Sequence, residues 1–347
     1  MWLATVLSMV TSAHAVEISW TGSAGHAANP QWSPDGTWLA FEVNNNADKV
    51  DMFLVKINSG NASGVPQKIV IPGSSSSFSS GGSYAANPNW HPKGPLIFEA
   101  ANAGGTTRLY YLMPGGSSPA EYLSTAQVGG GLAWPSLSPD GTKLVFTSGA
   151  TGLGDIYQFA QATNKVTPAM SSKEPENAPR YCSDGTTLVF SRKSHGTEDL
   201  FVWRGSGDAT PLRGGNGDQT RPICIGDRVV YYTNERGDDH WDLAVVPLAG
   251  GERTILAKDI RLPLRSAPAV NPEGTAVLYG SSAPSTDNFV FVTNLDGSGT
   301  RKINTGLTAV GDPDMVSANG RTWLSFTALP ASGADWRQLH VVDVTGQ

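Results

Sequence analysis

One phrase recurs along this chain and sets the architecture that we expect. It consists of a proline, usually an aromatic or apolar residue two positions later, a turn, and an apolar run rich in β-formers. The first copy reads Asn-Pro-Gln-Trp-Ser-Pro-Asp-Gly at residues 29–36, followed by Trp-Leu-Ala-Phe at 38–41. The prolines of the seven copies are spaced by 58, 47, 44, 43, 46 and 45 residues and are Pro30, Pro88, Pro135, Pro179, Pro222, Pro268 and Pro313. Such a period is typical of propeller blades, so the sequence predicts a seven-bladed β-propeller.

Each repeat divides into four short strands. In the third copy we expect strands at Pro135–Leu137, Lys143–Ser148 and Asp155–Ala160, and a fourth around Lys165–Pro168. These runs are β-branched and aromatic and are separated by Gly, Pro, Asn or Asp, which is the pattern of strands joined by tight turns. The predicted fold class is therefore all-β, built from four-stranded antiparallel blades.

The seventh copy has room for only three strands before Gln347. Val16–Trp20, ahead of the first copy, has the alternation of a strand. We expect this segment to complete the seventh blade and to close the ring, because closure removes an exposed sheet edge that would promote aggregation.

The first fifteen residues have the features of an export signal. Met1–Val10 is largely apolar, and Ala13-His14-Ala15 fits the small-x-small pattern of a signal-peptidase site. An ordinary apolar first segment is the alternative. The signal interpretation predicts a signal peptide at residues 1–15, a propeller at residues 16–347, and a periplasmic or secreted protein.

Composition narrows the classes of partner. The chain has 24 Lys and Arg against 30 Asp and Glu, a formal net charge of −6. Nucleic-acid binding is not expected, because affinity for phosphate backbones comes largely from clustered basic residues. No apolar run approaches the length of about 18 residues that suggests a membrane span.

The two cysteines, Cys182 and Cys224, follow Pro179 and Pro222 on the inner strands of neighbouring blades. Export would permit a disulfide. We nevertheless expect two buried free thiols, because neighbouring blades can hold the two Cα atoms beyond the limit of about 7 Å for bridging.

Strand direction assigns the loops to two faces of the ring. One face, called the loop face below, carries the starts of the inner strands and the loops between the second and third strands of each blade. The other face carries near-identical Asp-Gly turns. The loop face varies most from blade to blade, and loops on a rigid scaffold commonly bind ligands. The candidate ligand-binding residues on it are Asn29, Asn87, Trp134, Arg180, Arg221, Arg265 and Asp312.

These residue types suit particular partners. Arginine suits carboxylates, and tryptophan suits sugar rings or a partner's side chain. The alternative for the arginines is local pairing, in which Arg180, Arg221 and Arg265 neutralise nearby acids. Those acids would be Glu176, Asp218 and Asp259.

Other features have structural explanations. The Ser/Gly-rich insertion Ser74–Ser83 is either a flexible loop or a lid over the channel mouth. Acidic residues recur at the start of the third strand, where we expect one structural hydrogen bond per blade; they are Asp51, Asp155, Asp199 and Asp242. The histidines form no metal-binding pair, and no Gly-x-Ser-x-Gly occurs. No catalytic residue, cofactor or metal site is predicted.

The recurring phrase, with Pro-x-Trp-Ser-Pro-Asp-Gly before Leu-Ala-Phe, resembles the WD40-like (PD40) repeat of TolB-type β-propellers. The resemblance covers about residues 28–347. It implies the fold, whereas TolB-like blades serve many unrelated roles.

Two functions follow from the sequence. The first is a non-enzymatic, exported, monomeric propeller that binds a protein, an envelope-associated partner or a glycan through its loop face and channel mouth. The alternative is a carbohydrate-active enzyme, a polysaccharide lyase or a glycosidase, acting at the channel mouth.

Overall fold

The computed structural model describes residues 15–46, 49–72, 84–101, 105–116, 118–123, 126–152, 154–170, 172–333 and 335–347. Most of the predicted signal peptide (residues 1–14) and the 74–83 insertion lie outside these ranges. Every regular element in the described ranges is a β-strand. These ranges contain no helix of the length and apolarity needed to cross a membrane.

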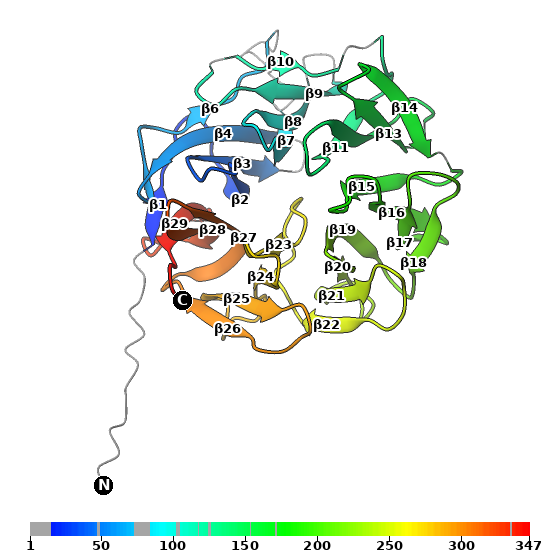
Figure 1. Ribbon diagram of the computed structural model, residues 1–347. Coiled ribbons are helices and arrows are strands. Elements are labelled where there is room, and N and C mark those ends of the chain that lie inside the picture. Colours follow the sequence, from blue (N-terminus) through cyan, green and yellow to red (C-terminus); the bar gives the residue numbers. More distant parts are fainter. Residues whose placement is uncertain are drawn as a thin grey trace.

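The strands form antiparallel sheets arranged around a central axis (Figure 1). Four of these sheets consist of four consecutive strands each. Their members are β11 (Leu132–Leu137), β12 (Lys143–Ser148), β13 (Asp155–Ala160) and β14 (Lys165–Met170); β15 (Glu176–Tyr181), β16 (Leu188–Ser194), β17 (Thr197–Trp203) and β18 (Thr210–Arg213); β19 (Gln219–Ile225), β20 (Arg228–Thr233), β21 (Asp242–Pro247) and β22 (Thr254–Ala257); and β23 (Ala269–Val270), β24 (Ala276–Gly280), β25 (Phe289–Asn294) and β26 (Arg301–Asn304). The first of these sheets has the four strands expected for the third repeat.

A nine-stranded sheet contains the first two repeats. Its strands are β2 (His26–Trp32), β3 (Trp38–Asn46), β4 (Lys49–Asn58), β5 (Asn61–Ala62), β6 (Gln67–Lys68), β7 (Tyr84–Trp90), β8 (Leu96–Ala101), β9 (Thr107–Leu112) and β10 (Ala120–Glu121). Its two antiparallel halves, β2–β6 and β7–β10, are joined by one parallel pair, Val50 with Tyr84.

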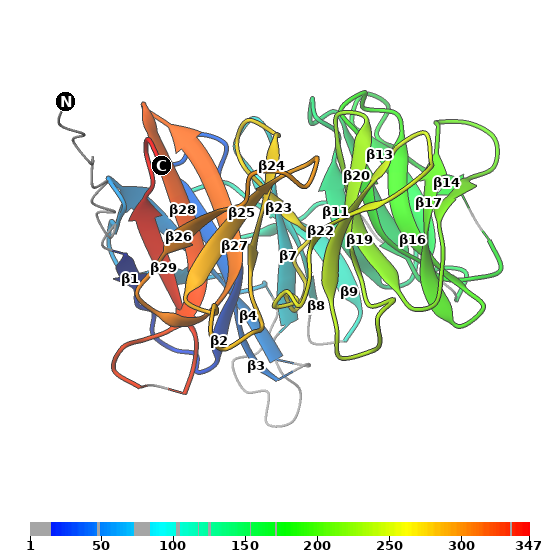
Figure 2. The same cartoon turned by 90° about the horizontal axis from the view of Figure 1, so that it is seen from below.

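The last sheet contains strands from both ends of the chain. It orders β1 (Val16–Ile18), β29 (Gln338–Asp343), β28 (Arg321–Leu329) and β27 (Thr308–Ala318). Val16 lies opposite Val341 and Ile18 lies opposite Leu339 in antiparallel register. Figure 2 shows β1 beside β29 at one side of the molecule.

The core repeats from sheet to sheet. An aromatic ring of the second strand stacks on a ring of the third strand, as in Phe41 on Phe53 at 5.4 Å and Phe190 on Phe201 at 5.9 Å between centroids. In the last sheet the partner of Phe326 is His340, at 5.4 Å. His340 is buried, neither ring nitrogen has a hydrogen-bond partner among the described residues, and burial lowers its pKa to about 4. The fold therefore holds this imidazole neutral.

The inner strands share a β-bulge at the repeated proline. The residue before the proline has a φ between 44° and 56° in six of them, at Asn29, Asn87, Trp134, Ala178, Arg221 and Asp312. The strand register shifts at the same points. Residues other than glycine rarely occupy this left-handed region, so the surrounding structure has to stabilise it.

The cysteine prediction is wrong, because Cys182 and Cys224 form a disulfide. Their Cα atoms lie 4.9 Å apart, within bridging range. Cys224 is on the inner strand β19, and Cys182 directly follows the inner strand β15. The two inner strands lie closer together than we expected. Cys182 is three residues after its repeat proline and Cys224 is two, and this offset directs the two side chains toward each other.

Candidate functional site

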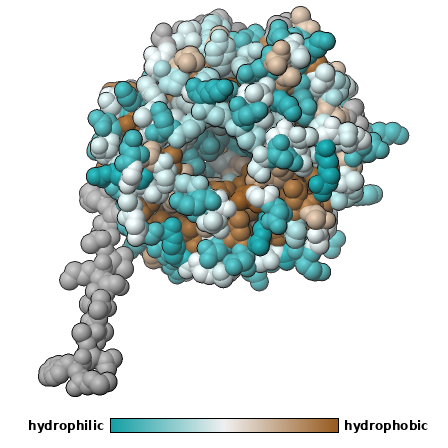
Figure 3. All heavy atoms as spheres, viewed as in Figure 1, coloured by the Kyte–Doolittle hydropathy of each residue, from teal (hydrophilic) through white to brown (hydrophobic). Residues whose placement is uncertain are grey.

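The repeat pattern is interrupted before Pro268, where the chain forms an extended loop. Ala267 does not have the positive φ of its counterparts, and β23 has only two residues. The preceding segment, residues 261–268, is called the strap below. In Figure 1 this loop, in yellow, extends from β23 toward β2. Figure 3 shows that the molecule is hollowed at its centre.

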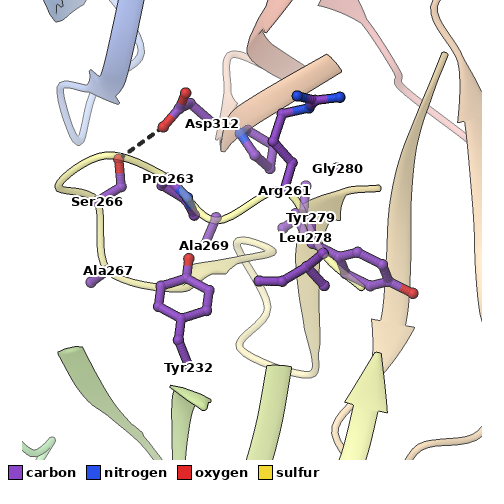
Figure 4. Close-up of a pocket in the computed structure, with 12 residues that line it drawn as sticks. Tyr232, Arg261, Pro263, Ser266, Ala267, Ala269, Leu278, Tyr279, Gly280 and Asp312 are labelled. Atoms are coloured by element: carbon purple, nitrogen blue, oxygen red, sulfur yellow. Dashed lines mark hydrogen bonds between the residues drawn. The ribbon is translucent and has the colours of Figure 1, made fainter. Parts of the chain in front are cut away.

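Hydrogen bonds attach the strap to distant parts of the chain. The Arg265 guanidinium donates to Asn44 Oδ1 at 2.7 Å, and the Ser266 hydroxyl donates to Asn29 Oδ1 at 2.9 Å. Ser266 also lies 3.4 Å from Asp312 Oδ1, the contact drawn in Figure 4. From β19, Arg221 donates to the carbonyl oxygen atoms of Pro263 at 2.8 Å and Ser266 at 3.1 Å. These contacts hold the strap against three different sheets.

Two buried glutamates bond the bulges of neighbouring inner strands. Glu42 Oε1 accepts hydrogen bonds of 2.8 Å from Asn29 Nδ2 and from the backbone N–H of Asn87. Burial raises the pKa of Glu42 to about 7, against the opposing effects of Asn29 and Arg265. Its Oε2 is 3.8 Å from Arg265 Nη1. The carboxylate thus stabilises the left-handed residue of the next inner strand.

Glu99 repeats this arrangement one blade further on. Its Oε2 accepts a hydrogen bond of 2.6 Å from the backbone N–H of Trp134, and its Oε1 accepts one from the Tyr84 hydroxyl. The two glutamates occupy the same place in β3 and β8, directly after the buried phenylalanines Phe41 and Phe98. A carboxylate at this place therefore explains how the bulges at Asn87 and Trp134 are held.

The structure brings the predicted site residues into two groups. Asn29, Asn87, Arg221, Arg265 and Asp312 meet through Glu42 and the strap. Trp134 and Arg180 lie in another sector, where Arg180 donates to the carbonyl oxygen of Pro135 at 3.0 Å. Two of the acids considered for local arginine pairing have other partners, because Arg192 pairs with Glu176, and Arg236 and His240 pair with Asp259.

Two arginines at the mouth were missed by the sequence analysis. Arg261 begins the strap, and Arg337 directly precedes β29. A Cβ atom added to Gly311 would lie 2.9 Å from Arg337 Nη1 and 3.0 Å from Arg261 Cδ, so both side chains pass over this glycine. No repeat pattern could identify them, because both lie outside the recurring phrase; the glycine before Asp312 is the only local signal.

The recurring acids mainly support turns and loops. Asp51 accepts a hydrogen bond from Ser23, Asp155 accepts one from Thr151, and Asp242 accepts two from Arg236. This matches the structural role expected for three of the four positions. In the described part of the chain, no group of three His, Cys, Asp or Glu residues could hold a metal ion.

Comparison with known proteins identifies the fold. No family model and no curated protein matches the chain. Among solved structures, a putative TolB from Agrobacterium tumefaciens is similar, with a TM-score of 0.52 and 19% identity over 68% of this chain and 82% of that one. The β-propeller domain of the trilobed protease from Pyrococcus furiosus has a TM-score of 0.61 and 12% identity over 93% and 96% of the two chains. The structure therefore has the fold of a TolB-like β-propeller.

The same fold also occurs in enzymes. An oligogalacturonate lyase in complex with manganese matches with a TM-score of 0.64 and 12% identity, covering 96% of this chain and 98% of that one. Similarity at this level of identity shows the fold alone, so function has to be argued from the site.

Proposed function

We propose that this protein is an exported, non-enzymatic β-propeller that binds a protein or cell-envelope partner through its loop face. Exposed apolar side chains beside arginines carry the proposal. Leu264, on the strap, is 56% exposed, and Trp336, in the β28–β29 loop, is 36% exposed. Each lies within three residues of a mouth arginine, Arg261 or Arg337. Aromatic and arginine side chains are enriched in protein interfaces, where buried apolar contact supplies much of the affinity.

The proposal includes the architecture of the whole ring. Counting the two halves of the nine-stranded sheet as separate blades gives seven blades in one propeller over residues 16–347. In this arrangement β1 closes the ring by completing the sheet of β27–β29. The antiparallel pairing of β1 with β29 supports closure.

Export to the periplasm or beyond is also part of the proposal. The Cys182–Cys224 disulfide supports it, because disulfides form and persist mainly in oxidising compartments. The predicted signal peptide would supply the route.

In this proposal the seven predicted site residues line the channel mouth. Asn29, Asn87 and Asp312 are buried, and their contacts shape the bulges and the strap. Trp134 is only partly buried, so its ring is the member of this set that we expect to touch a partner.

Capture from an envelope extract, with the tagged mature chain as bait, tests the proposal. Leu264→Ala and Trp336→Ala should each reduce the captured partner several-fold. Met113→Ala is the matched control, because Met113 is 53% exposed and lies after β9, on the Asp-Gly turn face. Equal loss in the Met113 variant, or capture unaffected by the loop-face changes, would refute the proposed face.

One observation favours a second candidate, a polysaccharide lyase or glycosidase. Burial raises the pKa of Glu42, which lies beneath the strap residue Arg265, to about 7, a value that suits a general acid at neutral pH. The assay is incubation with oligogalacturonate and other polysaccharides, followed by detection of unsaturated products and new reducing ends. Activity that Glu42→Gln abolishes would support the enzyme; activity unchanged by this variant would reject Glu42 as its acid.

A further inference from the structure

The five arginines described above divide into two classes. Arg180, Arg221 and Arg265 donate hydrogen bonds to protein oxygen atoms. In the described part of the chain, the guanidiniums of Arg261 and Arg337 have no such bond. Arg261 Nη2 is 3.9 Å from Asp287 Oδ2, and Arg337 Nη1 is 3.8 Å from Asp312 Oδ2. These separations allow electrostatic attraction but are too long for hydrogen bonds.

The nearby acids are already engaged elsewhere. Asp287 Oδ2 accepts a hydrogen bond of 2.9 Å from the backbone N–H of Ala309. Asp312 Oδ2 accepts one of 3.2 Å from Thr327 Oγ1, and Asp312 Oδ1 faces Ser266. Consequently, these two carboxylates leave most donors of the two guanidiniums for another acceptor.

The two arginines also repel each other. Burial lowers the pKa of Arg261, and the positive charge of Arg337 lowers it further. Their side chains are 28% and 20% exposed, so the charges are partly removed from water yet still accessible. Figure 4 shows Arg261 and Asp312 at the same end of the pocket beneath the strap. An added anion between the guanidiniums would relieve this repulsion.

We infer that Arg261 and Arg337 form a carboxylate-binding subsite that takes an acidic peptide segment of the protein partner. The inference rests on the proposed function and names the chemistry of that partner. Two guanidiniums can give a carboxylate parallel charge-assisted hydrogen bonds. The exposed side chains of Leu264 and Trp336 lie three residues and one residue along the chain from Arg261 and Arg337, and the Trp336 ring packs edge-on against His26 at 4.8 Å between centroids. The preferred segment therefore places an apolar residue next to Asp or Glu.

Fluorescence anisotropy with defined peptides tests the inference. The probe is a fluorescein-labelled hexapeptide of Glu and Leu residues, and its neutral partner has Gln in place of every Glu. We expect the wild-type protein to prefer the acidic peptide. The double variant Arg261→Gln/Arg337→Gln should bind it at least about tenfold more weakly. Arg321→Gln is the matched control, because Arg321 is exposed at the start of β28 and pairs with Asp343.

Several outcomes would overturn the inference. They are equal binding of the neutral peptide, unchanged affinity in the double variant, or an equal loss in Arg321→Gln. Trigalacturonate serves as a third probe, and its binding in place of the acidic peptide would assign the subsite to a uronate. A thermal melt of each variant separates loss of binding from loss of folding.

The two proposals can fail independently. Capture that depends on Leu264 and Trp336 but not on Arg261 and Arg337 would overturn the subsite and leave the proposed function standing. Capture that does not depend on the loop face would overturn the proposed function itself.

Discussion

Glu42 Oε1 accepts a hydrogen bond of 2.8 Å from the backbone N–H of Asn87, which lies 45 residues further along the chain. The bond joins β3 to β7 and holds Asn87 at a φ of 53°. A buried carboxylate of one repeat thus fixes the backbone of the next.

The first prediction concerns the protonation of Glu42. Its pKa is about 7 in the folded chain and near the ordinary 4.5 when unfolded, so folding favours the protonated form. The stability that this group contributes is full below pH 4.5 and is lost as the pH rises through about 7. Glu42→Gln should make the free energy of unfolding less dependent on pH. Between pH 4.5 and pH 8 the wild type should lose about 2–3 kcal/mol of stability that the variant keeps. Urea unfolding at the two pH values measures it; parallel curves for the two proteins would contradict it.

The second prediction concerns His340, whose effect has the opposite sign. Its pKa is about 4 when folded against 6.5 when unfolded, so stability is lost as the pH falls from 6.5 toward 4. His340→Phe keeps the stacked ring and removes two buried nitrogens that lack partners. We expect the variant to be more stable by about 1–3 kcal/mol, with the larger gain at pH 5. Thermal melts at pH 5 and pH 8 test this. A variant less stable than the wild type at both would show that the site does not accept the larger ring.

The third prediction concerns the disulfide. The linked cysteines are 42 residues apart, for which loop-closure entropy gives about 4 kcal/mol of stabilisation. Cys182→Ser/Cys224→Ser should lower the free energy of unfolding by about this amount. Reductant should destabilise the wild type only. Alkylation after unfolding without reductant provides the direct check: two added alkyl groups on the wild type would show free thiols.

The fourth prediction concerns closure by β1. Deleting Val16–Thr21 removes the partner of β29 and exposes its edge, so the shortened chain should melt at a lower temperature or aggregate. Melting and light scattering measure the two effects. Ile18→Asp tests the apolar contribution separately, because Ile18 is 1% exposed in the core beside Leu339. An unchanged melting temperature in both variants would rule out closure by this strand.

The repeat spacing predicts the strand positions well where the repeat is regular. In the third repeat, β12 and β13 have the bounds expected from the sequence, and β11 begins three residues earlier than Pro135. The pattern could not give the distance between neighbouring inner strands, and the disulfide was missed for that reason.

The candidate site was less predictable, because its distinctive residues lie where the repeat breaks. Arg261 and Arg337 belong to the strap and to the β28–β29 loop, whose courses depend on tertiary contacts such as that of Arg265 with Asn44. The sequence places Arg180 and Arg221 near the inner strands. It does not reveal that both guanidinium groups donate hydrogen bonds to backbone carbonyl oxygen atoms.

The strap also has a consequence for how the protein folds. Units in repeat architectures generally contact only their immediate neighbours, so unfolding can begin in one unit and spread gradually. Here Arg265 and Ser266 reach Asn44 and Asn29, past the intervening sheet of β27–β29. Loosening either the first repeat or the sixth would therefore release contacts in the other. These contacts between non-adjacent repeats should make unfolding more cooperative than it would be if each repeat contacted only its neighbours.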